Sequence, residues 1–252
     1  MTRSAWQFLR NAFVCLALAC FALGAAQAAD YSLVTGTDYP PYADAKLPDG
    51  GLAVRIVKHA LEHVGRTIDI QVLPWSRGFA AVRDGKADGT FPYAPSPDRT
   101  LVMQASTPIF ILESHIWFAP DRPIAGVSAA DLAGKRFCLP IGYAAAEPLQ
   151  ALIDHGVVRL VVPRNLENCV RMVQGNHADF TADDPDVIRA VLQDTHIDLV
   201  ESSQSLQNRP LVLLVAKGRP RGVALLADFN EGLRRMKADG SYDRLVKLWP
   251  GS

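Results

Sequence analysis

The sequence carries no excess of charge of either sign. Its 26 Lys and Arg residues match its 26 Asp and Glu residues. Without residues 1–28, which hold two arginines and no acids, 24 basic residues stand against 26 acidic ones, a net charge of −2. Proteins that bind nucleic acids or anionic membranes rely on a strongly basic surface. The composition therefore argues against both as partners.

The short motifs of nucleophilic catalysis and phosphate binding are also missing. The chain contains no GxSxG, SxxK, Walker-type glycine loop or CxxC, so hydrolases of those types, nucleotide sites and zinc knuckles lack support. One HxxEH run, from His59 to His63, matches an inverted zinc-protease motif. Its charged side chains share the polar face of an amphipathic helix, and no third ligand is in view. We predict no catalytic residue, no bound metal and no cofactor.

Long apolar runs are absent beyond the N-terminus. Residues 12–23 form an apolar run behind two arginines, and the Ala-Gln-Ala triplet at 26–28 is the small-x-small pattern of a cleavage site. We predict a signal peptide over residues 1–28, cleaved before Ala29, and hence a periplasmic protein. A lipid-anchored start at Cys20 is the alternative.

Cysteine is scarce. Of four cysteines, two leave with the predicted signal peptide, and Cys138 and Cys169 remain. An even pair of cysteines in an oxidising compartment predicts a disulfide between them. The alternative is a pair of buried thiols, because free cysteine packs as a small apolar residue.

The apolar residues that are present recur with the periods of alternating strands and helices. Residues 31–35 favour a short strand, residues 52–64 repeat apolar side chains at helical spacing, and residues 68–72 alternate as a second strand. A strand, a crossover helix and a second strand form a βαβ unit with parallel strands. Asp38 and Tyr39 follow the first strand, on a loop that prolines keep out of a helix.

The pattern of the first half is repeated in the second half. Residues 82–88 and 172–179 both run from a helix end through a glycine and an Ala-Asp pair into a strand. We therefore predict an α/β protein of two similar lobes. Chain crossings near residues 113–120 and 208–217 would make the first lobe discontinuous and allow a hinge. The predicted bounds are 29–117 with 212–252 for lobe 1, and 118–211 for lobe 2.

The stretch from residue 74 to residue 99 gathers aromatic and basic side chains on loops at the ends of regular elements. In open α/β sheets, such loops hold ligands. We expect Arg99 to bind a carboxylate with two hydrogen bonds, and Trp75 and Tyr93 to cover the body of the ligand. Arg77 is a second candidate cation. The alternatives are surface ion pairs for both arginines and core packing for Trp75.

Seven short motifs, in their order and spacing, resemble the bacterial extracellular solute-binding proteins of family 3, the periplasmic receptors of polar amino acid ABC transporters. The motifs are GTDYPPY at 36–42, PWSR at 74–77, GKAD at 85–88, PDR at 97–99, STP at 106–108, DLAGK at 131–135 and ADGSYD at 238–243. The resemblance spans nearly the whole mature chain. It implies a type II periplasmic binding protein fold, in which two hinged lobes, each a mixed sheet flanked by helices, close on a ligand.

The resemblance also implies roles for particular residues. Arg99 matches the arginine that holds the α-carboxylate of an amino acid ligand. Asp184, with Asp183 as the alternative, matches the acid that holds the α-ammonium group. Because it precedes Pro185, Asp184 could instead cap the helix that follows. Tyr39 and Trp75 match residues that pack on the ligand side chain. Apart from the resemblance, we expect Asp38, on the loop after the first strand, to orient Arg99 or Arg77 rather than to touch the ligand.

Three departures from the family pattern weaken the case for an α-amino acid as the ligand. Residues 90–97 are bulky and rich in proline, which has no N–H to donate, where relatives offer small hydroxyl residues and exposed N–H groups. Tyr143 or Ala144 stands where a threonine helps to hold the carboxylate, which places Tyr143 at the predicted site. Ala53 and Arg55 stand at positions that are acidic in relatives.

We predict a periplasmic solute-binding protein that captures a small polar solute, an amino acid or a related carboxylate, by hinge closure. Its partners would be that ligand and an inner-membrane ABC permease, and we expect a monomer. One alternative is a ligand-sensing module for a signalling partner. The other is an enzyme resembling cyclohexadienyl dehydratases, which would need Asp184, Asp183 or Glu147 as an acid or base in the cleft.

Overall fold

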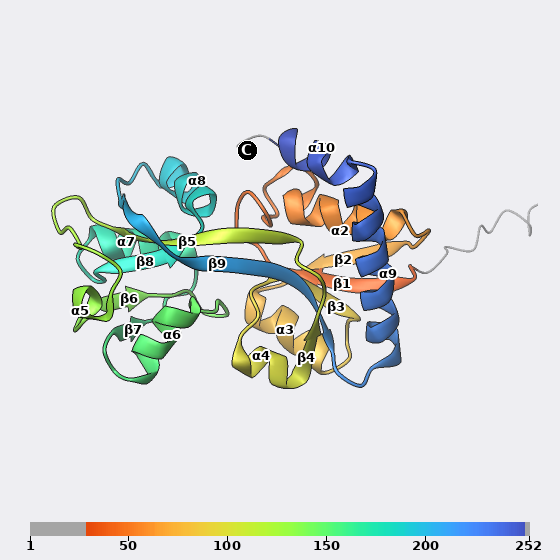
Figure 1. Cartoon of the computed structure of the whole chain (residues 1–252), viewed down its shortest axis with the longest axis horizontal. Helices are drawn as coiled ribbons and strands as arrows, with labels where there is room; N and C mark the ends of the chain where they lie inside the picture. The colour runs from red at the N-terminus through yellow and green to blue at the C-terminus, as the bar shows by residue number, and fades with distance from the viewer. Residues whose placement is uncertain (1–28, 250–252) are drawn as a thin grey trace, which may run out of the picture.

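The computed structural model describes residues 29–249 and folds them into two lobes (Figure 1). The predicted signal peptide, residues 1–28, lies outside the described residues. Within the described part, nine strands form one continuous sheet in the order β2-β1-β3-β9-β5-β8-β6-β7, with β4 also paired to β9. No helix in residues 29–249 combines the length and the hydropathy of a membrane span.

The first lobe is built around a short parallel sheet. Its elements are β1 (Tyr31–Thr35), the 3-10 helix η2 (Pro48–Gly50), α2 (Leu52–Glu62), β2 (Ile68–Val72), α3 (Trp75–Arg83), β3 (Gly89–Tyr93), α4 (Pro97–Val102), β4 (Met103–Ala105), α9 (Pro220–Ala238) and α10 (Ser241–Lys247). β1 pairs in parallel with both β2 and β3. Because α2 connects β1 to β2, the predicted βαβ unit is confirmed.

Small residues let helices cover both faces of this sheet. A Cβ atom at Gly89 of β3 would lie 2.7 Å from a methyl group of Leu225 in α9. On the opposite face, a Cβ atom at Gly78 of α3 would lie 3.0 Å from Val34 of β1. The first lobe is therefore a three-layer structure, with its core on both sides of the strands.

The second lobe repeats this plan with a mixed sheet. Its elements are β5 (Phe110–Phe118), α5 (Ala129–Leu132), β6 (Arg136–Cys138), α6 (Glu147–Asp154), β7 (Arg159–Val161), α7 (Leu166–Gln174), β8 (Phe180–Asp183), α8 (Pro185–Thr195) and β9 (Val200–Ala216). β6 pairs in parallel with β7 and β8, and β5 pairs antiparallel with β8. Phe137 and Phe180 stack on the face covered by α5 and α6, with ring centroids 5.0 Å apart.

The predicted disulfide is confirmed. Cys138, at the end of β6, is bonded to Cys169 of α7, and their Cα atoms lie 5.5 Å apart. Both residues are completely buried. The bond fastens α7 to the face of the sheet opposite to the Phe137 and Phe180 pair, because successive side chains of β6 point to opposite faces.

Two long strands connect the lobes. β5 and β9 pair antiparallel from Phe110 with Leu211 to Phe118 with Val200, and the register shifts around His115. Figure 1 shows both strands running from one lobe into the other. The predicted lobe boundaries, 117/118 and 211/212, fall inside these strands, and they stay a prediction.

Candidate functional site

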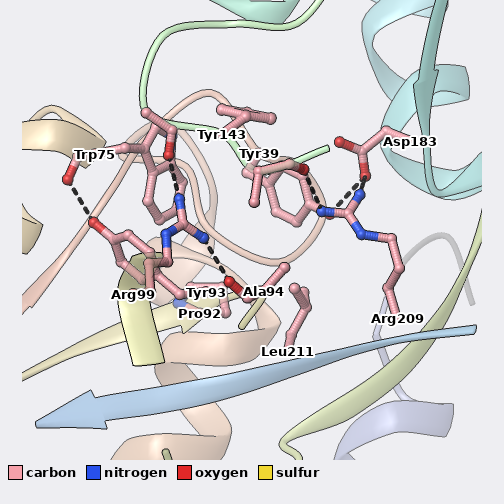
Figure 2. A pocket seen from close by; sticks show the side chains of 12 residues that line it. Tyr39, Trp75, Pro92, Tyr93, Ala94, Arg99, Tyr143, Asp183, Arg209 and Leu211 are labelled. Carbon is pink, nitrogen blue, oxygen red and sulfur yellow. Dashed lines mark hydrogen bonds and ion pairs between the residues drawn. The ribbon is translucent and has the colours of Figure 1, made fainter. Parts of the chain in front are cut away.

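A small pocket lies between the lobes, at the carboxyl ends of strands from both of them (Figure 2). The first lobe contributes residues that follow β1, end or follow β3, and lie in the first turns of α3 and α4, and the second lobe contributes residues that follow β6 and end β8. β9 contributes two more. The lining residues are Tyr39, Trp75, Pro92, Tyr93, Ala94, Arg99, Gly142, Tyr143, Ala144, Asp183, Arg209 and Leu211, around a cavity of about 30 Å³.

Arg99 places a guanidinium in this pocket without an acidic partner among the described residues. It lies in the first turn of α4, which Ser96 caps. Its Nη1 donates to the carbonyl oxygen of Ala94 at 2.6 Å, and its Nη2 donates to that of Gly142 at 2.7 Å. The guanidinium also lies 4.9 Å from the centroid of the Tyr93 ring. Two of its five N–H groups donate to these carbonyl oxygens, so the guanidinium has further N–H groups that can donate to an anion.

Burial changes the electrostatics of Arg99. Removal from water lowers the pKa of its guanidinium to about 10; the nearby Tyr93 opposes this shift, and the positive charge of Arg209 adds to it. A buried cation without a counter-ion is costly, and an anion that binds beside it removes part of that cost. The pocket is therefore suited to a ligand with a negatively charged group.

Asp183 and Arg209 form a buried ion pair on the other side of the pocket (Figure 2). Nη1 of Arg209 lies 3.7 Å from Oδ1 of Asp183, and Nη2 of Arg209 donates to the carbonyl oxygen of Ala144 at 2.8 Å. The same Oδ1 accepts hydrogen bonds from the Tyr39 hydroxyl and the Asp184 backbone N–H, both at 2.8 Å. Two guanidinium groups and one carboxylate thus line the pocket.

Aromatic rings form the walls between these charges. The Trp75 ring lies edge-on to Tyr93 and Tyr143, at centroid distances of 5.3 and 6.1 Å. The Tyr93 hydroxyl donates to the Trp75 carbonyl oxygen at 2.6 Å. Gly36 makes room for the indole, because a Cβ atom there would overlap the Trp75 ring. Rings fixed in this way offer an apolar surface to the body of a ligand.

The sequence profile of the bacterial extracellular solute-binding proteins, family 3, matches residues 31–252. The chain belongs to this family. Its two-lobed architecture and its pocket at the strand ends agree with that membership. A comparison with curated proteins finds no match.

Comparison with solved structures shows that this solute-binding protein has the fold of type II periplasmic binding proteins. An ancestral arginine-binding protein bound to arginine shares 20% identity over 88% of this chain and 98% of its own, with a TM-score of 0.75. A histidine kinase sensor domain similar to periplasmic binding proteins shares 23% identity over 88% and 96%, with a TM-score of 0.76. The amino acid ABC transporter substrate-binding protein AbpA from Streptococcus pneumoniae, bound to L-arginine, shares 18% identity over 86% and 92%, with a TM-score of 0.70.

The lobes of this solute-binding protein touch across the pocket. The Tyr143 hydroxyl of the second lobe donates to the backbone carbonyl oxygen of Asp38 at 3.1 Å. Gly142 packs on α3 so closely that a Cβ atom on it would lie 2.9 Å from Trp75 Cβ and 3.0 Å from Ser76 N. The Arg99 bond to Gly142 and the Tyr39 bond to Asp183 also join the lobes. The structure is therefore a closed form, held by polar contacts.

Of the residues singled out from the sequence, Tyr39, Trp75, Tyr93, Arg99 and Tyr143 all line the pocket. Asp183 does so as well, whereas Asp184 lies outside the lining. The Asp184 carboxylate caps α8, where Oδ1 accepts from the Asp186 N–H at 3.0 Å and from the Tyr42 hydroxyl at 3.4 Å. Burial and the neighbouring Asp183 charge raise the pKa of Asp184 to about 7.

Asp38 and Arg77 also lie outside the lining. Asp38 has a positive φ of 63° and accepts a hydrogen bond from the Trp75 indole N–H at 3.1 Å, so it positions that ring. Burial raises the pKa of Asp38 to about 6. The hydrogen bonds that it accepts from Trp75 and from the Leu166 backbone N–H lower the pKa and oppose this shift in part. Arg77 is exposed on α3. The structure does not bring Asp38 or Arg77 to Arg99 among the hydrogen bonds and ion pairs of the described residues.

Sequence reasoning missed Arg209. This residue lies within the predicted crossing of residues 208–217, followed by Pro210, and no motif distinguishes it. The HxxEH run gathers no metal-binding cluster in the described part of the chain. His59 instead faces Glu62 at 3.3 Å, and His63 faces Asp239 at 3.3 Å.

Proposed function

We propose that this protein is a periplasmic, monomeric solute-binding protein that captures a small carboxylate between its lobes and delivers it to an ABC permease. The observation that carries the proposal is Arg99, a buried guanidinium that faces a pocket between two lobes and meets no acid among the described residues. A carboxylate accepts two parallel hydrogen bonds from a guanidinium, a stronger contact than either backbone carbonyl provides.

Capture would proceed by hinge closure. β5 and β9 carry the chain between the lobes, and the register shift around His115 gives these strands a place to bend. A ligand that touches Arg99 in one lobe and Tyr143 in the other gains contacts only when the lobes are closed. The ligand therefore shifts the protein toward the closed form by its difference in affinity for the two forms.

We propose binding without chemical conversion. An enzyme in this cleft needs a carboxyl group that is available as an acid or base. Asp183 is paired with Arg209, and Asp184 caps α8. Glu147 lies in the first turn of α6, outside the pocket lining. These engagements support a binding role over a dehydratase-like reaction.

The similarity to a histidine kinase sensor domain, over 88% of the chain, favours a ligand-sensing module as the second candidate. Deletion of the gene separates the two roles. For a transport receptor, high-affinity uptake of the ligand is lost. For a sensor, uptake of the ligand by the cells is unchanged and the transcriptional response to the ligand is lost.

The thermal unfolding midpoint of residues 29–252 tests the binding role, with amino acids, hydroxy acids, oxo acids and dicarboxylates as ligands. A ligand at about 100 times its Kd adds roughly 2.7 kcal/mol of stability. We expect at least one carboxylate to raise the midpoint of the wild type and of Arg77→Ala, whose arginine lies outside the pocket, but not of Arg99→Ala. An equal shift in Arg99→Ala would contradict the proposal.

A further inference from the structure

Arg209 already pairs with the acid that would otherwise bind the α-ammonium group of an amino acid. Asp183 is the acidic residue among the lining residues, and its charge is matched by Arg209, at 3.7 Å, with both side chains less than a tenth exposed. Oδ1 of Asp183 holds this contact together with the Tyr39 hydroxyl and the Asp184 N–H. An α-ammonium group would have to share an acid that is already paired.

The charge balance of the lining decides which ligand is favoured. Arg99 and Arg209 contribute two positive charges and Asp183 one negative charge, and Arg209 lies close enough to act on the ionisation of Arg99. A carboxylate without an amine brings the lining to neutrality. A zwitterionic amino acid leaves its net positive charge unchanged and adds a third cation beside two buried ones, which is costly away from water.

We propose, on the basis of the binding role above, that the pocket selects compact carboxylic acids that carry no α-ammonium group. The aromatic walls of Trp75, Tyr93 and Tyr143 suit a short apolar or hydroxylated body. The cavity volume favours a small acid, because about 30 Å³ is well below the roughly 150 Å³ of a cavity that binds benzene. Arg209 is the residue that sets this preference.

Matched ligands that differ only at the α-carbon test the inference. The pairs are lactate and pyruvate against alanine, and glycolate and glyoxylate against glycine, with binding measured by titration calorimetry on residues 29–252. We expect the amine-free member of at least one pair to bind about tenfold more tightly than the amino acid, a difference of about 1.4 kcal/mol. Equal or tighter binding by the amino acids overturns the inference and leaves the proposed function standing. Failure of every member to bind overturns both.

Two variants test whether Arg209 causes the preference for amine-free acids over amino acids. Arg209→Met leaves Asp183 without its cation, so we expect the ratio of the two affinities to shift toward the amino acid by about tenfold or more. In Asp183→Asn with Arg209→Met, both charges of the pair are removed and Arg99 alone remains, so the preference for the acid is expected to return. Circular dichroism and thermal midpoints verify that both variants are folded. An unchanged affinity ratio in Arg209→Met overturns the role of this residue.

Discussion

Gly134 and Gly142 of the second lobe both have a positive φ but have different surroundings. Their φ angles are +74° and +85°, in the left-handed region that costs other residues about 1–2 kcal/mol. A Cβ atom on Gly134 would meet nothing within 4 Å, whereas one on Gly142 would lie 2.9 Å from Trp75 Cβ in the opposite lobe. Gly142 thus permits the close approach of the lobes as well as a turn.

Gly142→Ala is therefore expected to destabilise the closed form specifically. The added methyl group meets backbone and Cβ atoms of α3, which cannot swing aside as a flexible side chain does. We expect ligand affinity to fall by about tenfold or more, as measured by calorimetry, because less of the protein reaches the competent form. Gly134→Ala is the control: it also places alanine at a positive φ and should lose stability without losing affinity. Equal affinity losses in both variants would rule out the role of Gly142 in closure.

The Asp184 carboxyl makes stability depend on pH. Burial and the Asp183 charge raise its folded-state pKa to about 7, whereas an unfolded Asp has a pKa of about 3.9. At a pH between these two pKa values, the Asp184 carboxyl has lost its proton in the unfolded chain but keeps it in the folded chain. The contribution of Asp184 is therefore fully present below about pH 4 and is lost as the pH rises to about 7, a change of roughly 4 kcal/mol. Asp38, with a pKa of about 6, acts in the same direction.

Asp184→Asn removes this titration and keeps a side-chain oxygen for the cap of α8. We expect urea unfolding of the variant to show a shallower fall in the free energy of unfolding between pH 4 and pH 7 than the wild type. Asp194→Asn, an exposed acid on the same helix, should leave the slope unchanged. Identical slopes in wild type and Asp184→Asn would show that the carboxyl does not titrate as described.

For individual residues, the sequence predicts which kinds of side chain line the pocket, but it does not decide between two adjacent candidates such as Asp183 and Asp184. Loop position predicts Arg99, Trp75 and Tyr93 at the pocket, and the family resemblance adds Tyr39 and Tyr143. The ranking of Asp184 above Asp183 depends on one residue of register: Asp183 ends β8 and lines the pocket, and Asp184 before Pro185 becomes a helix cap. Arg209 reaches the pocket only through the long-range pairing of β9, which a local pattern does not contain.

Among the elements, α7 is attached to β6 by a covalent bond as well as by its buried apolar side chains. Cys138 and Cys169 are 31 residues apart, and closing a loop of that length in the unfolded chain is worth about 3–4 kcal/mol. We expect reductant to lower the free energy of unfolding by that amount in urea titrations. A variant with both cysteines changed to alanine should match the reduced protein and be insensitive to reductant. A wild type that is equally stable with and without reductant would contradict the expectation.

The first half of β9 is a strand that the sequence does not predict. Its apolar end, from residue 211 onward, is recognisable as a buried strand, but the structure begins the strand at Val200. Residues 201–207 are mostly polar and carry no alternating pattern. They become a strand because β5 supplies backbone partners, as in the pairing of Ser114 with Gln207. Pairing from outside the segment overrides its weak local preference.

For the molecule as a whole, two tyrosine hydroxyls contribute to the balance between open and closed forms. The Tyr39 hydroxyl reaches Asp183, and the Tyr143 hydroxyl reaches the backbone of Asp38, each from one lobe to the other. A hydrogen bond of this kind contributes about 1 kcal/mol. Tyr242 offers a matched comparison, because its hydroxyl donates to the Ile109 carbonyl oxygen at 2.7 Å within the first lobe.

The variant Tyr39→Phe with Tyr143→Phe should therefore shift the free protein toward the open form. Loss of about 2 kcal/mol from closure changes the ratio of closed to open molecules by roughly 30-fold. We expect a larger radius of gyration in small-angle scattering without ligand, and a return to the wild-type radius when the ligand saturates the site. Tyr242→Phe loses one hydrogen bond inside a lobe, so it should unfold at a lower urea concentration and keep the wild-type radius. If the double variant also keeps that radius, closure depends on the apolar contacts of Trp75 and Gly142 rather than on these hydroxyls, and Gly142→Ala becomes the variant that opens the protein.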